Sequence, residues 1–98
     1  MPAYLVVVRD TMKDPAAYAA YQAKAGPTLA GHPARVLAAN GALTSLEGAC
    51  PDGVILIEFP DVAAAEAWYH GPEYQAAIGQ RLAATTGRAV IVEGLAPA

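Results

Sequence analysis

The sequence has little charge, few basic residues and only one cysteine. Asp, Glu, Lys and Arg make up 15% of the 98 residues, against about 25% in an average soluble domain. Six basic residues are scattered along a chain of net charge −3, which argues against nucleic-acid binding because that function needs clustered Lys and Arg. Cys50 is alone and has no basic neighbour, so an internal disulfide is excluded and we expect an inert thiol.

Long hydrophobic runs, signal sequences and metal-binding motifs are missing as well. No run approaches the ~18 apolar residues of a membrane-spanning helix, and the N-terminus lacks the charged and apolar segments of a secretory signal. The two histidines, His32 and His70, have no Cys or carboxylate at the spacing of a metal site. No phosphate-binding loop, dinucleotide fingerprint or nucleophile elbow occurs. We therefore expect a cytoplasmic protein with no membrane contact, no metal and no cofactor.

Hydrophobic residues, in contrast, are abundant for so short a chain. They make up 55% of the sequence, yet a domain of this length buries only roughly 65% of its unfolded surface. We expect a partner to cover part of the remaining apolar surface, and the simplest partner is a second copy of the chain.

Four segments have the composition of β-strands: Ala3–Val8, Arg35–Leu46, Val54–Phe59 and Ala89–Val92. Both alternating sets of side chains are apolar in the first, third and last, whereas a strand with one covered face alternates apolar with polar. Glu58 is the exception, and it lies either on a solvated edge or in a pocket. The second segment is interrupted at Ala39-Asn40-Gly41, where we expect a bulge or bend.

Each half of the chain also contains the signature of a helix. Asp14-Pro15 and Pro60-Asp61 supply an N-cap Asp, Gly26-Pro27 and Gly71-Pro72 interrupt the two helices, and we expect a turn over Ala83–Gly87. The order β-α-β-β-α-β predicts a single ferredoxin-like α+β domain over residues 1–98, with both helices on one face of a four-stranded antiparallel sheet. Packing of two bare sheet faces would then give a homodimer.

The segment around Gly71-Pro72 holds the best candidates for chemistry. His70 ends the first helical piece and acts either as a general acid or base or as a cap on the last carbonyls. Arg81 lies nearly in line with Tyr74 on the second piece, and it either pairs with a carboxylate or presents its fork to an anionic ligand. The spacing predicts that the buried face of this piece consists of Tyr74, Ala77, Ile78 and Leu82.

Aromatic residues are the candidates for ligand binding. Trp68 and Tyr69 cannot both face inward, because adjacent helical residues point about 100° apart. One of them is expected to pack on the sheet and the other to line a pocket or the dimer contact. Tyr18 and Tyr21 share a helix face and either present their hydroxyls to a cavity or form part of the core. With Tyr74, these residues form the predicted ligand-binding set.

Several segments carry a resemblance to a known family. They are the opening AYLVVV, the helix start Asp14-Pro15-x-x-Tyr18-x-x-Tyr21 and, most specific, Trp68-Tyr69-His70-x-Pro72-Glu73-Tyr74-Gln75. Over nearly its whole length the chain resembles the family of domain of unknown function 1330. The resemblance implies the dimeric α+β barrel superfamily, in which two ferredoxin-like subunits pack their sheets together. Related families there include small cofactor-free monooxygenases, isomerase-like enzymes and dye- or haem-handling proteins.

One segment departs from the family pattern. Where the family tends to have Arg-Gly-Gly in the second strand, this chain has Ala39-Asn40-Gly41. Any role of that arginine in holding an anionic ligand is therefore lost here.

Three hypotheses for the function follow. The first is a cofactor-independent enzyme, monooxygenase- or isomerase-like, that acts on a small organic molecule in a pocket between helices and sheet, with proton transfer through His70 and polarisation by Tyr and Arg81. The second is a small-molecule binding module with the same pocket. The third is a structural dimer without a ligand.

Overall fold

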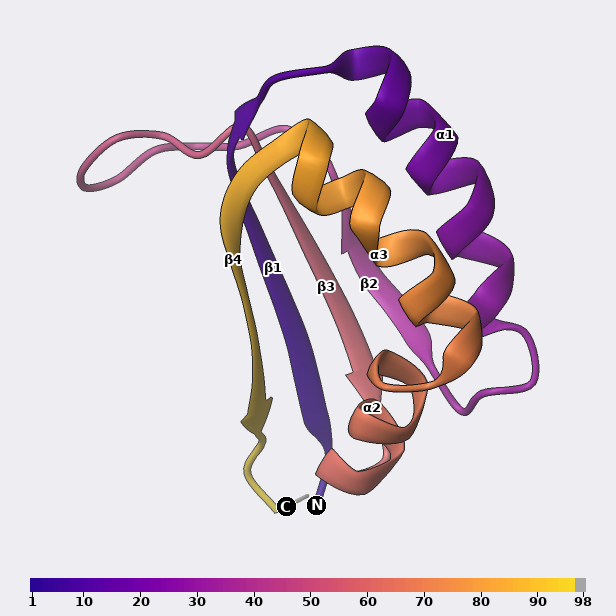
Figure 1. The fold of residues 1–98 in the computed structure, drawn as a ribbon. Helices are drawn as coiled ribbons and strands as arrows, with labels where there is room; N and C mark the ends of the chain where they lie inside the picture. Colours follow the sequence, from indigo (N-terminus) through magenta and orange to yellow (C-terminus); the bar gives the residue numbers. More distant parts are fainter. Residues whose placement is uncertain (97–98) are drawn as a thin grey trace.

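The computed structural model describes residues 1–96 and shows one antiparallel sheet with helices on one side (Figure 1). The sheet order is β2-β3-β1-β4, which is ferredoxin-like, as the sequence predicts. In chain order the elements are β1 (Ala3–Met12), α1 (Pro15–Ala25), the 3₁₀ helix η1 (Gly26–Leu29), β2 (Arg35–Ala39), β3 (Gly53–Phe59), α2 (Val62–Tyr69), α3 (Pro72–Ala84) and β4 (Thr85–Glu93).

Both predicted aspartate caps are present at the helix starts. Oδ1 of Asp14 accepts a hydrogen bond from the amide of Ala17 at 3.1 Å, and Oδ1 of Asp61 accepts one from Ala64 at 2.8 Å. Such a cap stabilises a protein by about 1 kcal/mol. Gly71-Pro72 separates α2 from α3 as predicted, with Pro72 in the first turn of α3.

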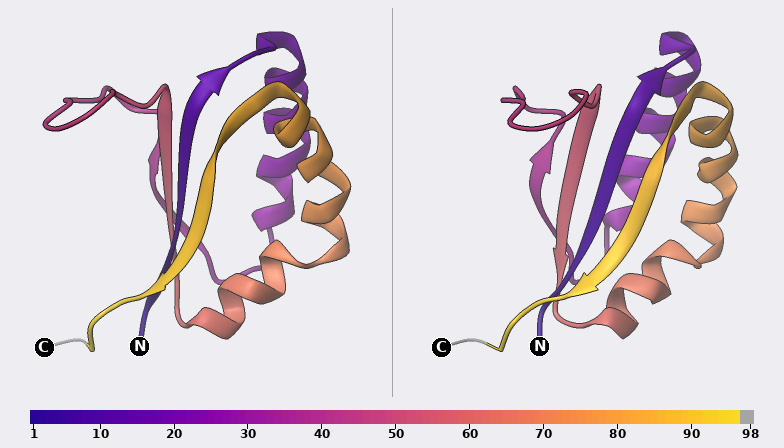
Figure 2. Two further views of the ribbon diagram at one scale, coloured as in Figure 1. Left: turned by 60° about the vertical axis from the view of Figure 1, so that its left-hand side comes forward. Right: turned by 90° about the vertical axis from the view of Figure 1, so that its left-hand side faces the viewer.

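The sheet has one covered and one bare face. Leu5 pairs with Ile57 and Ile91 across the central strands, and Leu5, Ile57 and Phe59 are buried beneath the helices. Figure 2 shows the sheet nearly edge-on, with every helix on the same side. The opposite face presents apolar side chains that are half-buried or exposed: Val6, Val8, Val54, Leu56, Val90 and Val92. The prediction that both faces are apolar is therefore confirmed.

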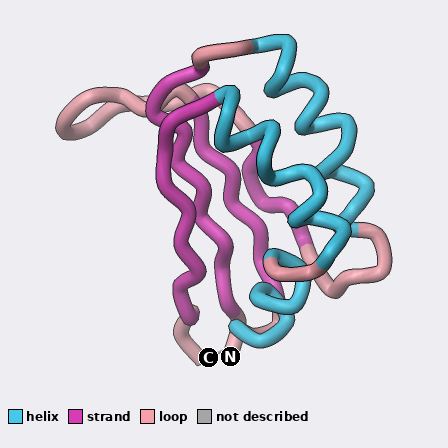
Figure 3. The backbone as a smooth tube through the Cα atoms, in the orientation of Figure 1, coloured by secondary structure: helices cyan, strands magenta, loops and turns pink. Residues whose placement is uncertain are grey.

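The second extended segment is shorter than the sequence predicts. Only Arg35–Ala39 pairs with β3, because Asn40 has a positive φ of 56° and turns the chain out of the sheet. A register shift lies between Val36 and Ala38, earlier than the expected bulge. The following loop, residues 41–52, extends away from the body beyond the bare face (Figures 2 and 3).

Two further expectations about the second half are wrong. No turn occurs over Ala83–Gly87, because α3 continues to Ala84 and β4 begins at Thr85. The buried face of α3 consists of Tyr74, Ala77, Arg81 and Ala84, while Leu82 is 61% exposed. Position i+7 lies only about 20° from Tyr74 around the helix, whereas i+8 lies about 80° away, so Arg81 rather than Leu82 faces the sheet.

Candidate functional site

A pocket of about 200 Å³ lies between the helices and the covered face of the sheet; we call it the helix–sheet pocket. Its sheet side is formed by apolar residues of β1, β2 and β3, among them Leu5, Val36 and Ile57. Its helix side includes Tyr21, Trp68 and Tyr74. A concave, mainly apolar space with a few polar groups is the usual form of a small-molecule site.

The helices place two phenol hydroxyls together at this pocket. The hydroxyl oxygens of Tyr21, on α1, and Tyr74, on α3, are 2.8 Å apart and share a buried hydrogen bond. Trp68 lies against Tyr74, with ring centroids 4.2 Å apart, and its indole Nε1 donates to Oγ1 of Thr28 at 3.0 Å. The indole nitrogen is thus satisfied within the fold, and the phenols are among the polar residues that line the pocket, together with Gln22 and Asn40.

Burial fixes the protonation state of these phenols. Burial raises the pKa of Tyr21 far above its ordinary value, and the hydrogen bond with Tyr74 raises it further. Burial also raises the pKa of Tyr74, although the hydrogen bond from Tyr21 and the charge of Arg81 act in the opposite direction. Both hydroxyls therefore stay protonated near neutral pH and do not act as bases. One donates to the other, and the accepting hydroxyl keeps a proton for a further hydrogen bond.

A second cluster, around Arg9, adjoins the pocket. Its guanidinium carbon lies 4.6 Å from the ring centroid of Tyr18, and Nη1 donates to Oδ1 of Asn40 at 3.0 Å. Nη2 donates to the carbonyl of Asp52 at 3.0 Å, and Nε is 3.6 Å from its carboxylate. Gly53 permits this arrangement, because a Cβ there would collide with Arg9 and Asn40.

Arg81 lies between the two sets of residues. It is only 9% exposed, and it lines a small hollow of about 10 Å³ together with Arg9, Tyr18 and Asn40. Its charge acts on the hydroxyls of both Tyr21 and Tyr74. Within residues 1–96, no carboxylate lies within 4.0 Å of its guanidinium.

The structure separates the two residues predicted to be catalytic. His70 is exposed and lines a different hollow, of about 180 Å³, with Glu66, Tyr69 and the edge of β4. Its backbone amide donates to the carbonyl of Glu66 at 2.9 Å, at the end of α2. His70 and Arg81 thus belong to different cavities. Of the neighbouring pair, Trp68 lines the helix–sheet pocket and Tyr69 the hollow beside β4.

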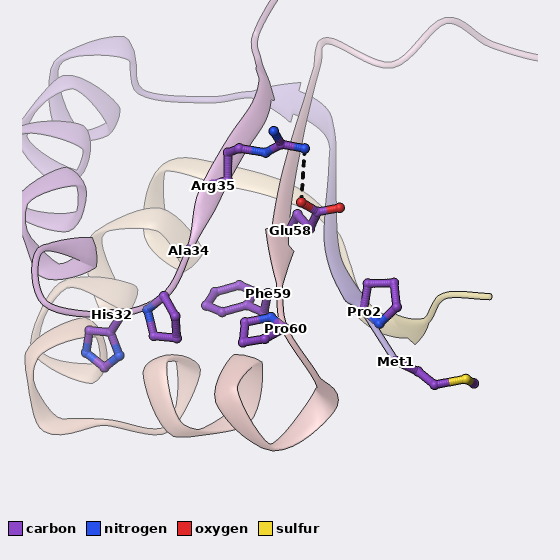
Figure 4. Close-up of a pocket in the computed structure, with 9 residues that line it drawn as sticks. Met1, Pro2, His32, Ala34, Arg35, Glu58, Phe59 and Pro60 are labelled. Atoms are coloured by element: carbon purple, nitrogen blue, oxygen red, sulfur yellow. Dashed lines mark ion pairs between the residues drawn. The ribbon is translucent and has the colours of Figure 1, made fainter. Parts of the chain in front are cut away.

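A larger groove of about 740 Å³ lies at the end of the sheet (Figure 4). Arg35 and Glu58 face each other in it, with Nη2 and Oε1 3.1 Å apart, while His32 lies at the other end. Glu58 is therefore on the solvated side of the sheet. Arg35 and Glu58 already pair with each other in this groove, whereas the helix–sheet pocket adjoins the hollow of buried Arg81. We therefore take the helix–sheet pocket as the candidate site.

The pattern of the sequence indicated most of the site but not all of it. Tyr21, Trp68 and Tyr74 meet at the pocket, and Tyr18 lies in the adjoining cluster. Arg9 and Asn40 were not among the predicted site residues. The signal for them was an arginine at the end of an apolar run and an Asn-Gly pair that breaks a strand. Within the described residues, no group of three or more His, Cys, Asp or Glu is placed to hold a metal ion.

Comparisons with known proteins agree with this fold. A protein of unknown function from Rhodopseudomonas palustris is 27% identical, with a TM-score of 0.74, over 98% of this chain and 84% of the other. A dimeric protein of unknown function with a ferredoxin-like fold, from Bacteroides fragilis, is 13% identical, with a TM-score of 0.63, over 95% and 96%. A putative antibiotic biosynthesis monooxygenase from Chloroflexus aurantiacus is 15% identical, with a TM-score of 0.55, over 100% and 97%.

Two sequence comparisons and one property of the helices remain. No curated protein matches it. Across residues 1–96, the structure contains no helix that is both long and apolar enough to cross a membrane. The family model for a domain of unknown function, DUF1330, matches residues 2–95, and the chain therefore belongs to the DUF1330 family.

Proposed function

We propose that this protein binds a small, mainly apolar organic molecule in the helix–sheet pocket. The observation that carries the proposal is the pocket itself, an apolar space of about 200 Å³ with the hydroxyls of Tyr21 and Tyr74 in its wall. Drug-sized ligands occupy roughly 300–1,000 Å³, so the ligand is smaller than these. Shape and apolar contact provide most of the affinity, and the phenols orient one polar group.

The same proposal includes a homodimer formed through the bare sheet faces. Four strands about 4.8 Å apart, with about 23 Å of paired length, give this face an area of roughly 450 Å². The largest apolar patch of a typical monomer covers roughly 300–600 Å² and is often functional. Val90 and Val92 are 57% and 49% exposed on it. The Bacteroides fragilis structure with a ferredoxin-like fold is described as dimeric, which supports a second copy as the occupant.

We place this dimer in the cytoplasm. Cys50 is an exposed free thiol, and such thiols persist best in a reducing compartment.

Turnover of the bound molecule, without a cofactor, is the second candidate. It is favoured by the buried cation beside two phenols, because Arg81 and Tyr74 together can polarise a carbonyl or phenol oxygen. The description of the Chloroflexus aurantiacus protein as a putative monooxygenase points the same way. His70, the proposed proton-transfer residue, lines the hollow beside β4 and not the helix–sheet pocket. A His70→Ala variant tests it: lost turnover supports the role, whereas unchanged turnover with retained binding contradicts it.

A thermal-shift series tests the binding proposal. Neutral phenols, lactones and short acyl amides would be added to the wild-type protein and to an Ala39→Phe variant, because the Ala39 side chain lines the pocket and a phenyl ring there would fill it. We expect at least one class to raise the Tm of the wild type and not that of the variant. Ala20→Phe, at an exposed position of α1, is the control and should respond as the wild type does.

Two results would contradict the proposal. One is that no compound class shifts the Tm of the wild type. The other is that Ala39→Phe, with an unchanged circular dichroism spectrum, responds as strongly as Ala20→Phe.

A further inference from the structure

Arg81 is a buried cation that forms no ion pair with any carboxylate of residues 1–96. It is 9% exposed, it belongs to the stripe of α3 that packs on the sheet, and its Nε has no hydrogen-bond partner. Isolated buried charges are costly, so charged side chains are normally paired or hydrogen-bonded when they are buried. Its Nε is enclosed by the fold and has no partner there, whereas a snorkelling arginine keeps its charged head group in water.

None of the surrounding groups neutralises this charge. The nearby carboxylate of Asp52 is already paired with Arg9, its side chain is 46% exposed, and Arg9 adds a second positive charge to the same hollow. On the other side, the Tyr74 side chain is hydrogen-bonded to Arg81 as well as to Tyr21, but both hydroxyls are neutral and supply no negative charge. The hollow is thus lined by two cations, Arg9 and Arg81, and by no carboxylate of the described residues. The charge of Arg81 is therefore left without an anion.

The hollow beside Arg81 and the helix–sheet pocket share part of their walls. Val7, Asn40 and Ile55 line both spaces. Arg81 itself lines the hollow, and its charge acts on Tyr21 and Tyr74, which line the pocket. A molecule in the pocket therefore has apolar surroundings along the sheet, and the positive charge nearest to it on this side is that of Arg81 in the adjoining hollow.

We infer that the pocket takes a small organic acid, whose carboxylate pairs with Arg81 while its apolar body lies against Trp68 and the inner strands. This inference rests on the proposed function, because it names the class of ligand for the same pocket. The planar guanidinium matches a carboxylate well, since its N–H groups form a rigid fork. Of the two bonded phenols, the one that accepts the hydrogen bond keeps its own proton and can donate it to the same carboxylate.

The dimensions of the two spaces restrict the acid further. The hollow of about 10 Å³ has room for roughly one water-sized group, which suits one carboxylate oxygen and not a phosphate. The pocket of about 200 Å³ suits a body of roughly ten non-hydrogen atoms, well below drug size. Charge and shape together favour an aryl- or alkyl-substituted monocarboxylic acid.

Two ligands of the same shape, one charged and one neutral, show how much the carboxylate contributes to binding. We would titrate the full chain calorimetrically with 3-phenylpropanoate and with its neutral analogue 3-phenylpropanamide, at neutral pH and low salt. We expect the acid to bind at least about tenfold more tightly than the amide, since hydrogen bonds to charged groups exceed neutral ones by this order. The preference should decrease as salt is added.

Variants then assign the preference to one residue. In Arg81→Met the affinity for the acid should fall at least about tenfold while the affinity for the amide stays within about threefold. Arg81→Lys keeps the charge and should retain part of the preference, which guards against a folding defect in the methionine variant. Arg88→Met removes an arginine whose side chain is 72% exposed and should bind both compounds as the wild type does.

The outcomes distinguish the two levels of the proposal. Binding of the amide as tight as that of the acid would overturn the organic-acid inference and leave the pocket proposal standing. A preference for the acid over the amide that persists in Arg81→Met would have the same two consequences. Failure of the wild type to bind either compound would overturn the inference, and with a negative thermal-shift series it would overturn the pocket proposal too.

Discussion

The hydroxyls of Tyr21 and Tyr74 meet at 2.8 Å although the two residues are 53 positions apart in the sequence. Their rings are packed edge to face, with centroids 6.2 Å apart. This contact joins α1 to α3 directly above the sheet, and it closes one side of the helix–sheet pocket. The hydrogen bond is therefore both a link between the two halves of the fold and part of the proposed site.

Removal of either hydroxyl should destabilise the protein. Tyr21→Phe or Tyr74→Phe leaves one buried hydroxyl without its partner, and we expect a loss of about 1–2 kcal/mol in the free energy of unfolding. Tyr21→Phe/Tyr74→Phe together should cost less than the sum, because both partners are then apolar. Urea denaturation measures these values. Tyr69→Phe is the control, since no hydrogen bond to its hydroxyl is found within residues 1–96, and strict additivity of the two changes would contradict the prediction.

The raised pKa values of the two phenols predict a loss of stability at alkaline pH. An unfolded tyrosine ionises near pH 10.0, whereas the folded pKa of Tyr21 and that of Tyr74 lie above this value. The contribution of these groups is therefore fully present below pH 10.0 and is lost as the pH rises above it, because only the unfolded chain ionises. The urea midpoint should fall between about pH 9 and 11 more steeply in the wild type than in the double Phe variant. Equal slopes would show that the hydroxyls are not buried as described.

Replacement of Arg81 by an apolar residue should stabilise the unliganded protein. Arg81→Met removes a buried charge that has no anion, and similar replacements often gain stability. We expect the free energy of unfolding to rise by about 1–2 kcal/mol. Leu82→Met, at the exposed neighbouring position, should change it by less than about 0.5 kcal/mol. A loss of more than about 1 kcal/mol in Arg81→Met would mean that the fold itself satisfies this charge.

A charge in the centre of the bare face should dissociate the proposed dimer. Leu56 pairs with Val6 and Ala38 in the middle of this face, and two-fold symmetry would bring two copies of the change into one interface. We expect Leu56→Asp to raise the dimer dissociation constant at least about 30-fold, measured by light scattering over a range of concentrations. Ala20→Asp, on the exposed side of α1, should leave it unchanged. A wild-type monomer at micromolar concentration would end the dimer proposal.

The elements of the fold were largely predictable because their signals are local. Asp14 and Asp61 mark helix starts through their own hydrogen bonds to the next turn, and Gly71-Pro72 separates two helices through its backbone geometry. The position at which β2 ends was not predicted, because it depends on the positive φ of a single residue, Asn40. The inner and outer faces of the strands were also not distinguishable in advance, since both are apolar and register follows the polar pattern.

The site was harder to predict because it depends on contacts distant in sequence. Arg81 was expected nearly in line with Tyr74, but the buried face was assigned to Leu82 and not to Arg81, whereas Arg81 is buried and Leu82 is exposed. His70 and Arg81 lie on two helices whose relative direction is set at Gly71, and no local pattern gives that angle. The Arg9–Asn40 contact joins residues 31 positions apart, so only the folded sheet brings them together.

The short edge strand β2 has a consequence for how a ligand enters. Val36 and Ala39 of this strand form part of the pocket wall, yet all five residues of β2 are exposed, and within the described chain the strand pairs only with β3, through an irregular register. Segments of this kind open locally at a free energy far below that of global unfolding. Amide hydrogens of β2 should therefore exchange with solvent sooner than those of β1, and a bound ligand should slow this exchange. We therefore expect local opening of the five-residue strand β2 to set the rate at which a ligand enters and leaves the pocket.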